Sequence, residues 1–284
     1  MKTKNPYRTQ NIAFFFLFLA TLLIVVPVGL IVVIIIQKGL PAINWQFISD
    51  IPRQGMRAGG IFPAIVGTLY LVSGAIVFAL PIGLLAAIYL SEYSKDNLLT
   101  RIIKLAIVNL AGVPSVVYGL FGLALFVVFL KFGASILAGS LTLGIMILPV
   151  IITTSREALE SVPQSFREVS LSLGARKWQT IRHIVLPSAI PGILTGTILG
   201  LGRAAGETAP ILFTVAAFYL PQLPKSVFDQ AMALPYHLYV ISTQVPNVDE
   251  KVRYGTAFVL LTLVLFMNLV AIIVRNKFRK KKKW

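Results

Sequence analysis

Two ionisable side chains lie within an otherwise apolar stretch of the sequence and could bind a charged ligand. Arg203 and Glu207 are four residues apart in L-G-R-A-A-G-E-T-A-P. On a helix this spacing places both side chains on one face, where they could form a salt bridge. Ionisable groups inside a membrane span are costly and by default indicate function. The structural alternative is that the two charges only neutralise each other and so permit insertion into the bilayer.

The chemistry of this pair suits an oxyanion. The Arg203 guanidinium offers a fork of N–H donors that matches phosphate geometry. Glu207 would be the counter-charge, and it could accept the proton that phosphate carries and sulfate lacks. Thr208, the next residue of the same motif, completes the candidate substrate pathway. No catalytic residue and no metal site is predicted, since the chain has no cysteine and only two histidines, which are far apart.

Composition indicates that membrane helices must position these residues. The chain has 284 residues, of which 57% are hydrophobic and 13% are charged, against about 25% charged in a soluble domain. Mean hydropathy is +0.84. A soluble protein would show shorter apolar runs with polar faces, whereas a bilayer requires about 20 mostly apolar residues per spanning helix. We therefore expect an all-α membrane protein.

Apolar runs predict about six transmembrane helices in a single transmembrane domain, 1–284. The first run is too long for a signal peptide, so it is predicted to be an uncleaved extra helix before a core at about 61–275. Glycine and proline at 112–115 predict a break or kink in the third span. The predicted spans are 12–36, 61–90, 102–130, 134–152, 189–220 and 254–274.

Basic residues predict the orientation. With the N-terminus inside, the inner segments hold 18 Lys and Arg and the outer segments hold seven. The positive-inside rule then places both termini in the cytoplasm. The basic tail 275–283 is interpreted as an orientation signal rather than a site for nucleic acid. Segments 37–60 and 221–253 are expected to face outside, where they could receive a partner.

The inner connection 153–188 carries helix signals. Ser165 and Glu168 have the spacing of a capping box, with Ser165 as the N-cap. Gly174 suits a left-handed helix end. From Ala175 a second amphipathic stretch runs to Val185 and is expected to stop at the following Leu-Pro. From physics alone, this surface could lie on lipid headgroups or dock a protein.

The spacing in this connection resembles the EAA loop of ABC-importer permeases. Glu168, Gly174, Ile184 and Leu186-Pro187 fall where that loop places its Glu, Gly, Ile and Leu-Pro, although E-A-A reads E-V-S here. The resemblance implies that the helix before Gly174 docks on a cytoplasmic ATPase. The candidate coupling residues are Ser165, Glu168, Gly174 and Ala175.

Further motifs resemble the PstA-type phosphate permease family. They are G-G-I-F-P-A-I-V-G-T-L-Y-L, P-I-G-L-L-A-A-I-Y-L-S-E-Y, A-G-V-P-S-V-V-Y-G-L-F-G and G-R-A-A-G-E-T-A-P, between residues 59 and 210. The resemblance implies the type I ABC importer permease fold in the inner (cytoplasmic) membrane of a prokaryote. It also implies three partners: a second homologous permease, a cytoplasmic ATPase dimer and an extracytoplasmic phosphate-binding protein.

The chain is therefore expected to be a transporter subunit and not an enzyme. It lacks the phosphate-binding sequence G-x-x-x-x-G-K-[ST], so ATP is expected on the partner ATPase and no cofactor on this chain. Three alternatives stay open: a permease for another oxyanion such as molybdate or sulfate, a membrane-embedded enzyme, and a self-contained channel or carrier.

Overall fold

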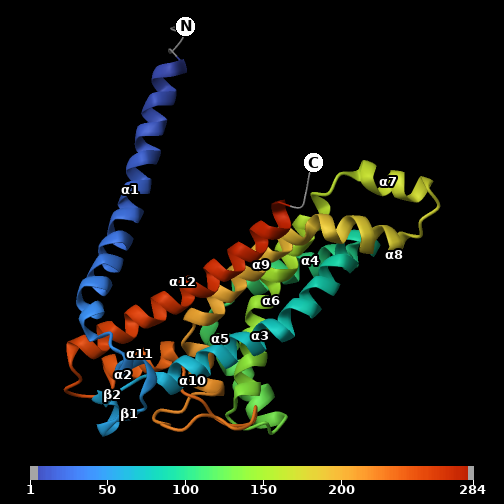
Figure 1. Ribbon diagram of the computed structural model, residues 1–284. Coiled ribbons are helices and arrows are strands. Elements are labelled where there is room, and N and C mark those ends of the chain that lie inside the picture. The colour runs from blue at the N-terminus through green and yellow to red at the C-terminus, as the bar shows by residue number, and fades with distance from the viewer. Residues whose placement is uncertain (1–5, 281–284) are drawn as a thin grey trace.

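The computed structural model describes residues 6–280, which are almost entirely helical. Among these residues, five helices are long and apolar enough to cross a bilayer, and a bent helix pair makes a sixth span if it is counted as one. Figure 1 shows most of the spans packed side by side, with α1 standing apart. The prediction of an all-α protein with about six spans is confirmed.

Four predicted spans are long helices. The four helices are α1 (Pro6–Gly39), α3 (Phe62–Ile88), α6 (Ile136–Glu160) and α12 (Glu250–Lys280). Three of them, α1, α6 and α12, extend beyond the predicted apolar runs at one or both ends, because helices continue into polar flanks where water satisfies the backbone. A π-helical segment, η3 (Tyr89–Tyr93), prolongs α3.

The third predicted span is broken. Helix α4 (Leu98–Ala111) and the run formed by α5 (Ser115–Gly122) and η4 (Leu123–Phe129) meet at an angle of 102°. Pro114 explains the break, because proline lacks an N–H and disfavours helical geometry in the preceding residue. The predicted break at 112–115 is confirmed, and a straight helix over 102–130 is not found.

The fifth predicted span, 189–220, was wrong at both ends. A helical run extends over Lys177–Gly206 through α8 (Lys177–Thr180), η5 (Ile181–Val185) and α9 (Leu186–Gly206). The expected stop before Pro187 does not occur. In the π-helical segment, the Leu186 N–H donates to the Ile181 carbonyl five residues back, and this wider turn accommodates the proline. The helix ends at Gly206, and after two non-helical residues a short helix, α10 (Ala209–Thr214), follows.

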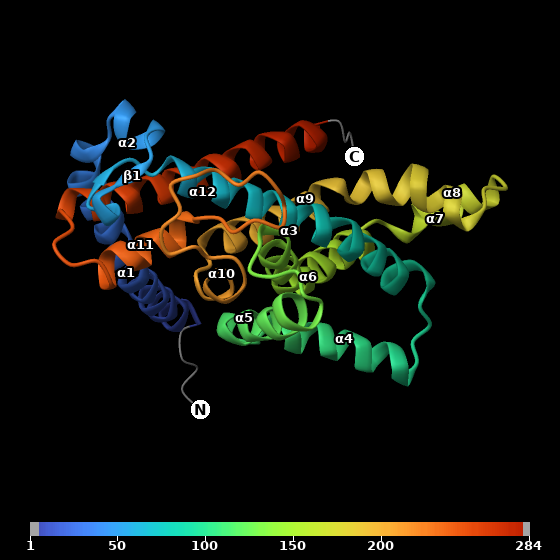
Figure 2. The same cartoon turned by 90° about the horizontal axis from the view of Figure 1, so that it is seen from below.

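The core lies where α3, α6 and α9 pack together. Leu71 on α3 and Leu143, Ile147 and Ile151 on α6 are completely buried. Small residues let these helices approach closely, as at Gly196, where any side chain would overlap Thr154 of α6. In contrast, the most apolar window of α1 has no residue buried within the chain. Figure 2 shows α5 beside α10 on one side of this core.

The two long segments that are expected to face outside, 37–60 and 221–253, fold against each other; they are called the outer segments below. Tyr219 donates to the carbonyl of Pro52 at 3.0 Å, and Arg57 donates to that of Pro246 at 3.1 Å. Lys38 and Glu250 form a 2.7 Å ion pair. The first segment contains η1 (Leu40–Ala42), α2 (Trp45–Ser49), η2 (Gln54–Met56) and a two-stranded antiparallel sheet, β1 (Pro52–Arg53) with β2 (Ala58–Gly59).

A buried helix in the second segment was not anticipated. Helix α11 (Leu234–Thr243) has ten residues, too few to span a bilayer, so its apolar pattern gave no span signal. Its first N–H, at Leu234, donates to the Thr68 hydroxyl of α3 at 2.8 Å. Both outer segments lie at one end of the molecule, whereas the start of α1, the end of α12 and the loop helices α7 (Gln164–Ser172) and α8 lie toward the other (Figure 1). This arrangement matches the predicted grouping of the loops.

The contact between α3 and the segment before α11 yields a prediction. A methyl group at Gly67 would overlap the backbone carbonyl of Met232, which cannot rotate away. We expect Gly67→Ala to destabilise the protein by about 1–3 kcal/mol through overpacking, seen as a lower apparent Tm in detergent. Gly29→Ala on α1, which has open space around it, is the control. Equal Tm values for the two variants would contradict this packing.

Candidate functional site

Arg203 and Glu207 lie together at the end of α9. The Arg203 Nε and the Glu207 Oε1 are 3.5 Å apart, and the side chains are 30% and 19% exposed. The predicted pairing is confirmed, but the helix ends at Gly206 and Glu207 has an extended backbone. Arg203 makes no other hydrogen bond to the residues that the structure describes. The pair is therefore loose, and the terminal nitrogens of the guanidinium are available to a ligand.

Thr208 follows Glu207 in the short non-helical link between α9 and α10. Thr208 is the N-cap of α10, but its side chain makes no capping hydrogen bond and is half-buried. Helix α10 packs on α5, where a side chain at Gly119 would strike the backbone of Ala209 and Pro210. The breaks in the third and fifth spans are thus brought together, as Figure 2 also shows for α5 and α10.

Tyr118 on α5 lies just after the break in the third span, and sequence reasoning did not single it out. Its hydroxyl donates to the Leu110 carbonyl of α4 at 2.8 Å, so it ties together the two halves of the broken span. An aromatic residue in an apolar run is usually interpreted as packing. The only available signal was its position just after the predicted break.

Arg203, Glu207 and Thr208 form a candidate anion site by their chemistry. A donor fork, a carboxylate and a hydroxyl meet where two spans are interrupted, and transporters commonly bind ions at such interrupted helices. Across residues 6–280, no group of three or more His, Cys, Asp or Glu side chains could hold a metal ion.

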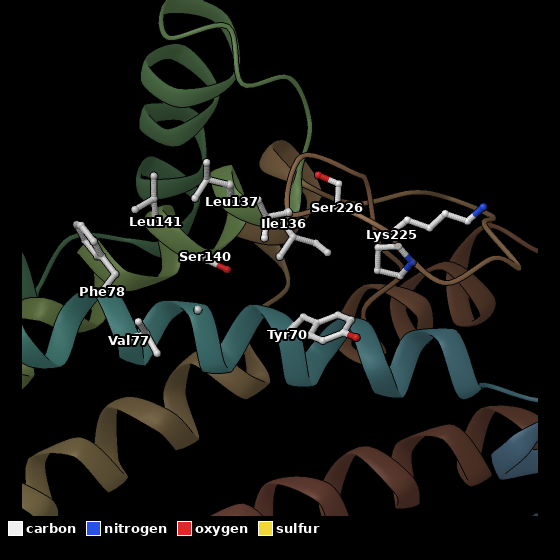
Figure 3. A pocket seen from close by; sticks show the side chains of 12 residues that line it. Tyr70, Val77, Phe78, Ile136, Leu137, Ser140, Leu141, Lys225 and Ser226 are labelled. Carbon is white, nitrogen blue, oxygen red and sulfur yellow. The ribbon is translucent and has the colours of Figure 1, made fainter.

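A separate cavity of about 540 Å³ lies between α3, α6 and residues 224–227. Its lining is mostly apolar, with Phe78 on α3 and Leu137 and Leu141 on α6 (Figure 3). The one charged lining residue is Lys225, whose amine points away from the other labelled side chains (Figure 3). Because no charge faces its interior, this cavity does not suit an oxyanion.

The loop helix α7 begins earlier than predicted. Its N-cap is Pro163, and Ser165 is the second helical residue, so the predicted capping box of Ser165 and Glu168 is wrong. Pro163 has a φ of −56°, which already suits a helix start, but it has no side-chain acceptor. Glu168 is exposed and makes no hydrogen bond among the described residues. Its carboxylate is left free at the surface.

The end of α7 was predicted correctly. Gly174 has a φ of +85°, a left-handed geometry that glycine adopts at little cost. The Gly174 N–H donates to Leu171 at 3.0 Å and the Ala175 N–H to Ser170 at 3.2 Å, which is a Schellman motif. Ala175 therefore belongs to the turn. The next helix begins at Lys177 and not at Ala175 as expected.

An apolar edge of α7 is left uncovered. Val169 is 60% exposed and Leu173 is 83% exposed, whereas Ile181 and Val185 of the next helical segment are buried. Phe166 packs against an apolar cluster formed around Leu159 and Val185, called the inner apolar cluster below. Of the four predicted coupling residues, Ser165 and Glu168 lie on α7, and Gly174 and Ala175 form the turn that ends it.

Sequence comparisons place these features among transport proteins. The family described as binding-protein-dependent transport system inner membrane component matches residues 79–284. The chain is 34% identical to the probable ABC transporter permease YqgI of Bacillus subtilis, over 89% of this chain and 90% of the relative. It is 35% identical to the phosphate transport system permease PstA 1 of Mycobacterium tuberculosis, over 94% and 88%.

Structural comparisons agree on the fold. A chain of the inward-facing MetNI methionine ABC transporter matches with a TM-score of 0.59 at 17% identity, over 77% of this chain and 94% of its own length. A chain of a bacterial ABC transporter involved in alginate import matches with a TM-score of 0.61 at 13% identity, over 96% of each. The expected importer permease fold is confirmed.

The turn at Gly174 can be tested without reference to function. Gly174→Val forces a β-branched residue into left-handed geometry, at a cost of about 1–2 kcal/mol or more. We expect faster tryptic cleavage after the exposed Arg176 and Lys177, measured by mass spectrometry. Gly174→Asn should cleave like the parent protein, because asparagine tolerates this conformation. Equal cleavage of the valine and asparagine variants would show that the turn does not depend on this geometry.

Proposed function

This chain belongs to the family of binding-protein-dependent transport system inner membrane components, and on that premise we propose that it is the permease subunit of an ATP-driven phosphate importer. The observation that supports phosphate as the substrate is the sequence identity of this chain to phosphate transport permeases. It is 34–35% identical to those of Mycobacterium tuberculosis, Xylella fastidiosa and Methanocaldococcus jannaschii, over 86–94% of this chain. The chain forms part of the translocation pathway and carries out no chemistry of its own.

Arg203, Glu207 and Thr208 form the polar part of the pathway in this proposal. The free guanidinium nitrogens bind two phosphate oxygens. Glu207, 3.5 Å from Arg203, accepts the proton of monohydrogen or dihydrogen phosphate, and the Thr208 hydroxyl donates to a third oxygen. Because the Arg203–Glu207 contact is long, phosphate has to displace only a weak interaction when it binds to Arg203. The site is thus able to bind an anion and release it again.

Helix α7 and the Gly174 turn couple this pathway to the ATPase. The exposed Val169 and Leu173 supply the apolar contact, and the unpaired Glu168 supplies a charge at the same surface. Burying such an apolar edge in a groove of a partner is favourable by about 25 cal/mol per Å². ATP is bound and hydrolysed by that partner dimer, and the end of the molecule that carries α7 faces the cytoplasm together with both termini.

The opposite end receives the remaining extracytoplasmic partner. Segments 37–60 and 221–253 form a joined outer surface through the Arg57 and Lys38 contacts, and Tyr219, just before the second segment, adds a third. A phosphate-binding protein docks there and releases its ligand above the broken spans. A second, homologous permease completes the pathway in the inner membrane, surrounded by lipid.

Uptake of radiolabelled phosphate tests this function directly. Cells that lack this chain but keep its partner subunits are compared with and without the chain restored, with unlabelled sulfate or molybdate as competitors. We expect restored uptake that neither competitor reduces. Uptake blocked by another oxyanion would assign the chain to that substrate. Failure to restore any uptake would show that phosphate is not its substrate.

Glu207→Gln tests the origin of the selectivity. Glutamine keeps the size of the side chain, but its amide can donate as well as accept, so sulfate is no longer rejected for lacking a proton. We expect the preference for phosphate over sulfate to fall by about tenfold, the worth of one charge-assisted hydrogen bond. Competition curves with both anions measure it, with the exposed Asp96→Asn as control. An unchanged preference would remove Glu207 from the selectivity mechanism.

A further inference from the structure

Arg167 joins three helices through one guanidinium. Its Nη2 donates to the Glu92 carboxylate at 2.7 Å and to the Leu159 carbonyl at 2.9 Å. Its Nη1 donates to the Val162 carbonyl at 2.6 Å, and its Nε lies 3.3 Å from Glu92 Oε1. Arg167 belongs to α7, Glu92 to the end of the α3 span, and Leu159 and Val162 to the end of α6 and the residues after it.

This contact is built to be stiff. The Arg167 and Glu92 side chains are only 13% and 8% exposed. A buried ion pair persists only when its remaining hydrogen-bonding groups are also satisfied, and here every nitrogen of the guanidinium has a partner. The two carbonyls lie at the C-terminal end of α6, where backbone oxygens lack helical partners and a cation is favourable. The planar fork also fixes the relative orientation of all three elements.

Few other contacts hold α7 to the rest of the chain. Phe166 packs on the inner apolar cluster. Ser170 hydrogen-bonds Thr180 at 2.9 Å, which ties α7 to α8. A polar cavity of about 600 Å³ opens beside the Arg167–Glu92 pair and separates the rest of α7 from α3 and α6. A displacement of α7 therefore reaches these spans mainly through Arg167 and Phe166.

A parallel contact reaches the same point of α3. The Lys177 ammonium lies 5.0 Å from the centre of the Tyr93 ring, a cation–π geometry. Tyr93 follows Glu92 directly, and Lys177 is the first residue of α8. Both loop helices are thus connected to the final turn of the α3 span. Lys177 makes this connection through one flexible ammonium, whereas hydrogen bonds from all three nitrogens hold the Arg167 guanidinium in place.

We propose that Arg167 and Glu92 are positioning residues that make α7, the inner end of α3 and the inner end of α6 move as one body during transport. This inference rests on the proposed function, because a partner ATPase supplies the force on α7. The displacement then reaches the candidate site, since α6 packs closely on α9 at Thr154 and Gly196, and Arg203 lies at the far end of α9.

The test uses the transporter assembled with its own partner subunits and reconstituted into vesicles. Glu92→Gln removes the charge and keeps the shape, and Arg167→Lys keeps the charge and removes the fork. For both variants we expect ATP hydrolysis within about twofold of the parent and phosphate uptake lowered at least about tenfold, in keeping with coupling effects of single contacts. The ratio of ATP hydrolysed to phosphate imported should therefore rise about tenfold.

The exposed ion pair of Arg101 and Asp96 is the matched control. It also joins an arginine to a carboxylate, at 3.0 Å and at the same end of the molecule. Its side chains, however, are 67% and 73% exposed. Asp96→Asn is expected to leave the ratio unchanged. If uptake and hydrolysis instead fall in step in Glu92→Gln and Arg167→Lys, or neither changes, the proposal is overturned.

A distance measurement separates this inference from the proposed function. Because this chain has no cysteine of its own, spin labels can be placed on it at two chosen positions, Leu85→Cys on α3 and Ser172→Cys on α7, with the partner subunits in cysteine-free form. Both positions are exposed. In the parent transporter we expect the same label separation without nucleotide and with ATP trapped; in Glu92→Gln it should differ between these states.

The two failures then look different. A label separation that changes in the parent transporter overturns the rigid connection, whatever the substrate is. If the parent vesicles import another oxyanion and no phosphate, the proposed substrate fails, whereas the constant separation still supports the connection.

Discussion

The bilayer offers no hydrogen-bond partner to a backbone N–H or C=O, and this constraint governs the architecture. Spans can be interrupted only where protein surrounds the freed groups. Both interruptions obey this rule, because the broken third span lies against the broken fifth span through α5 and α10. The same requirement places Arg203 and Glu207 at an interruption, where a charged ligand can approach without exposing backbone to lipid.

The two ends of α9 give the molecule its directional character. One end continues from α8, next to helix α7, on which Val169 and Leu173 are exposed at the surface. Its other end stops at Gly206, beside the Arg203–Glu207 ion pair. A single helical run over Lys177–Gly206 therefore connects the surface that a motor would move to the site that an anion would occupy.

Features governed by local sterics could be predicted from the sequence. Gly174 was recognised because one residue type dominates left-handed helix ends, and the break before Ser115 was recognised from Pro114 and its neighbours. The predicted helix end at Leu186-Pro187 was wrong because a π-helical turn accommodates the proline, and no simple sequence pattern signals such a turn. The Arg167–Glu92 pair joins residues 75 positions apart, and its existence depends on how α3, α6 and α7 pack, which one sequence does not encode in any local pattern.

The isolation of α1 has a consequence for the history of the sequence. Within this chain the helix meets α12 mainly at its outer end, near Gly39, where a side chain would overlap the Tyr254 carbonyl. Along the rest of its length almost any apolar residue would serve, since lipid does not select shape as a packed core does. Substitutions should therefore accumulate faster along α1 than along α6 as lineages diverge, except at Gly39, where the substitution rate should stay low.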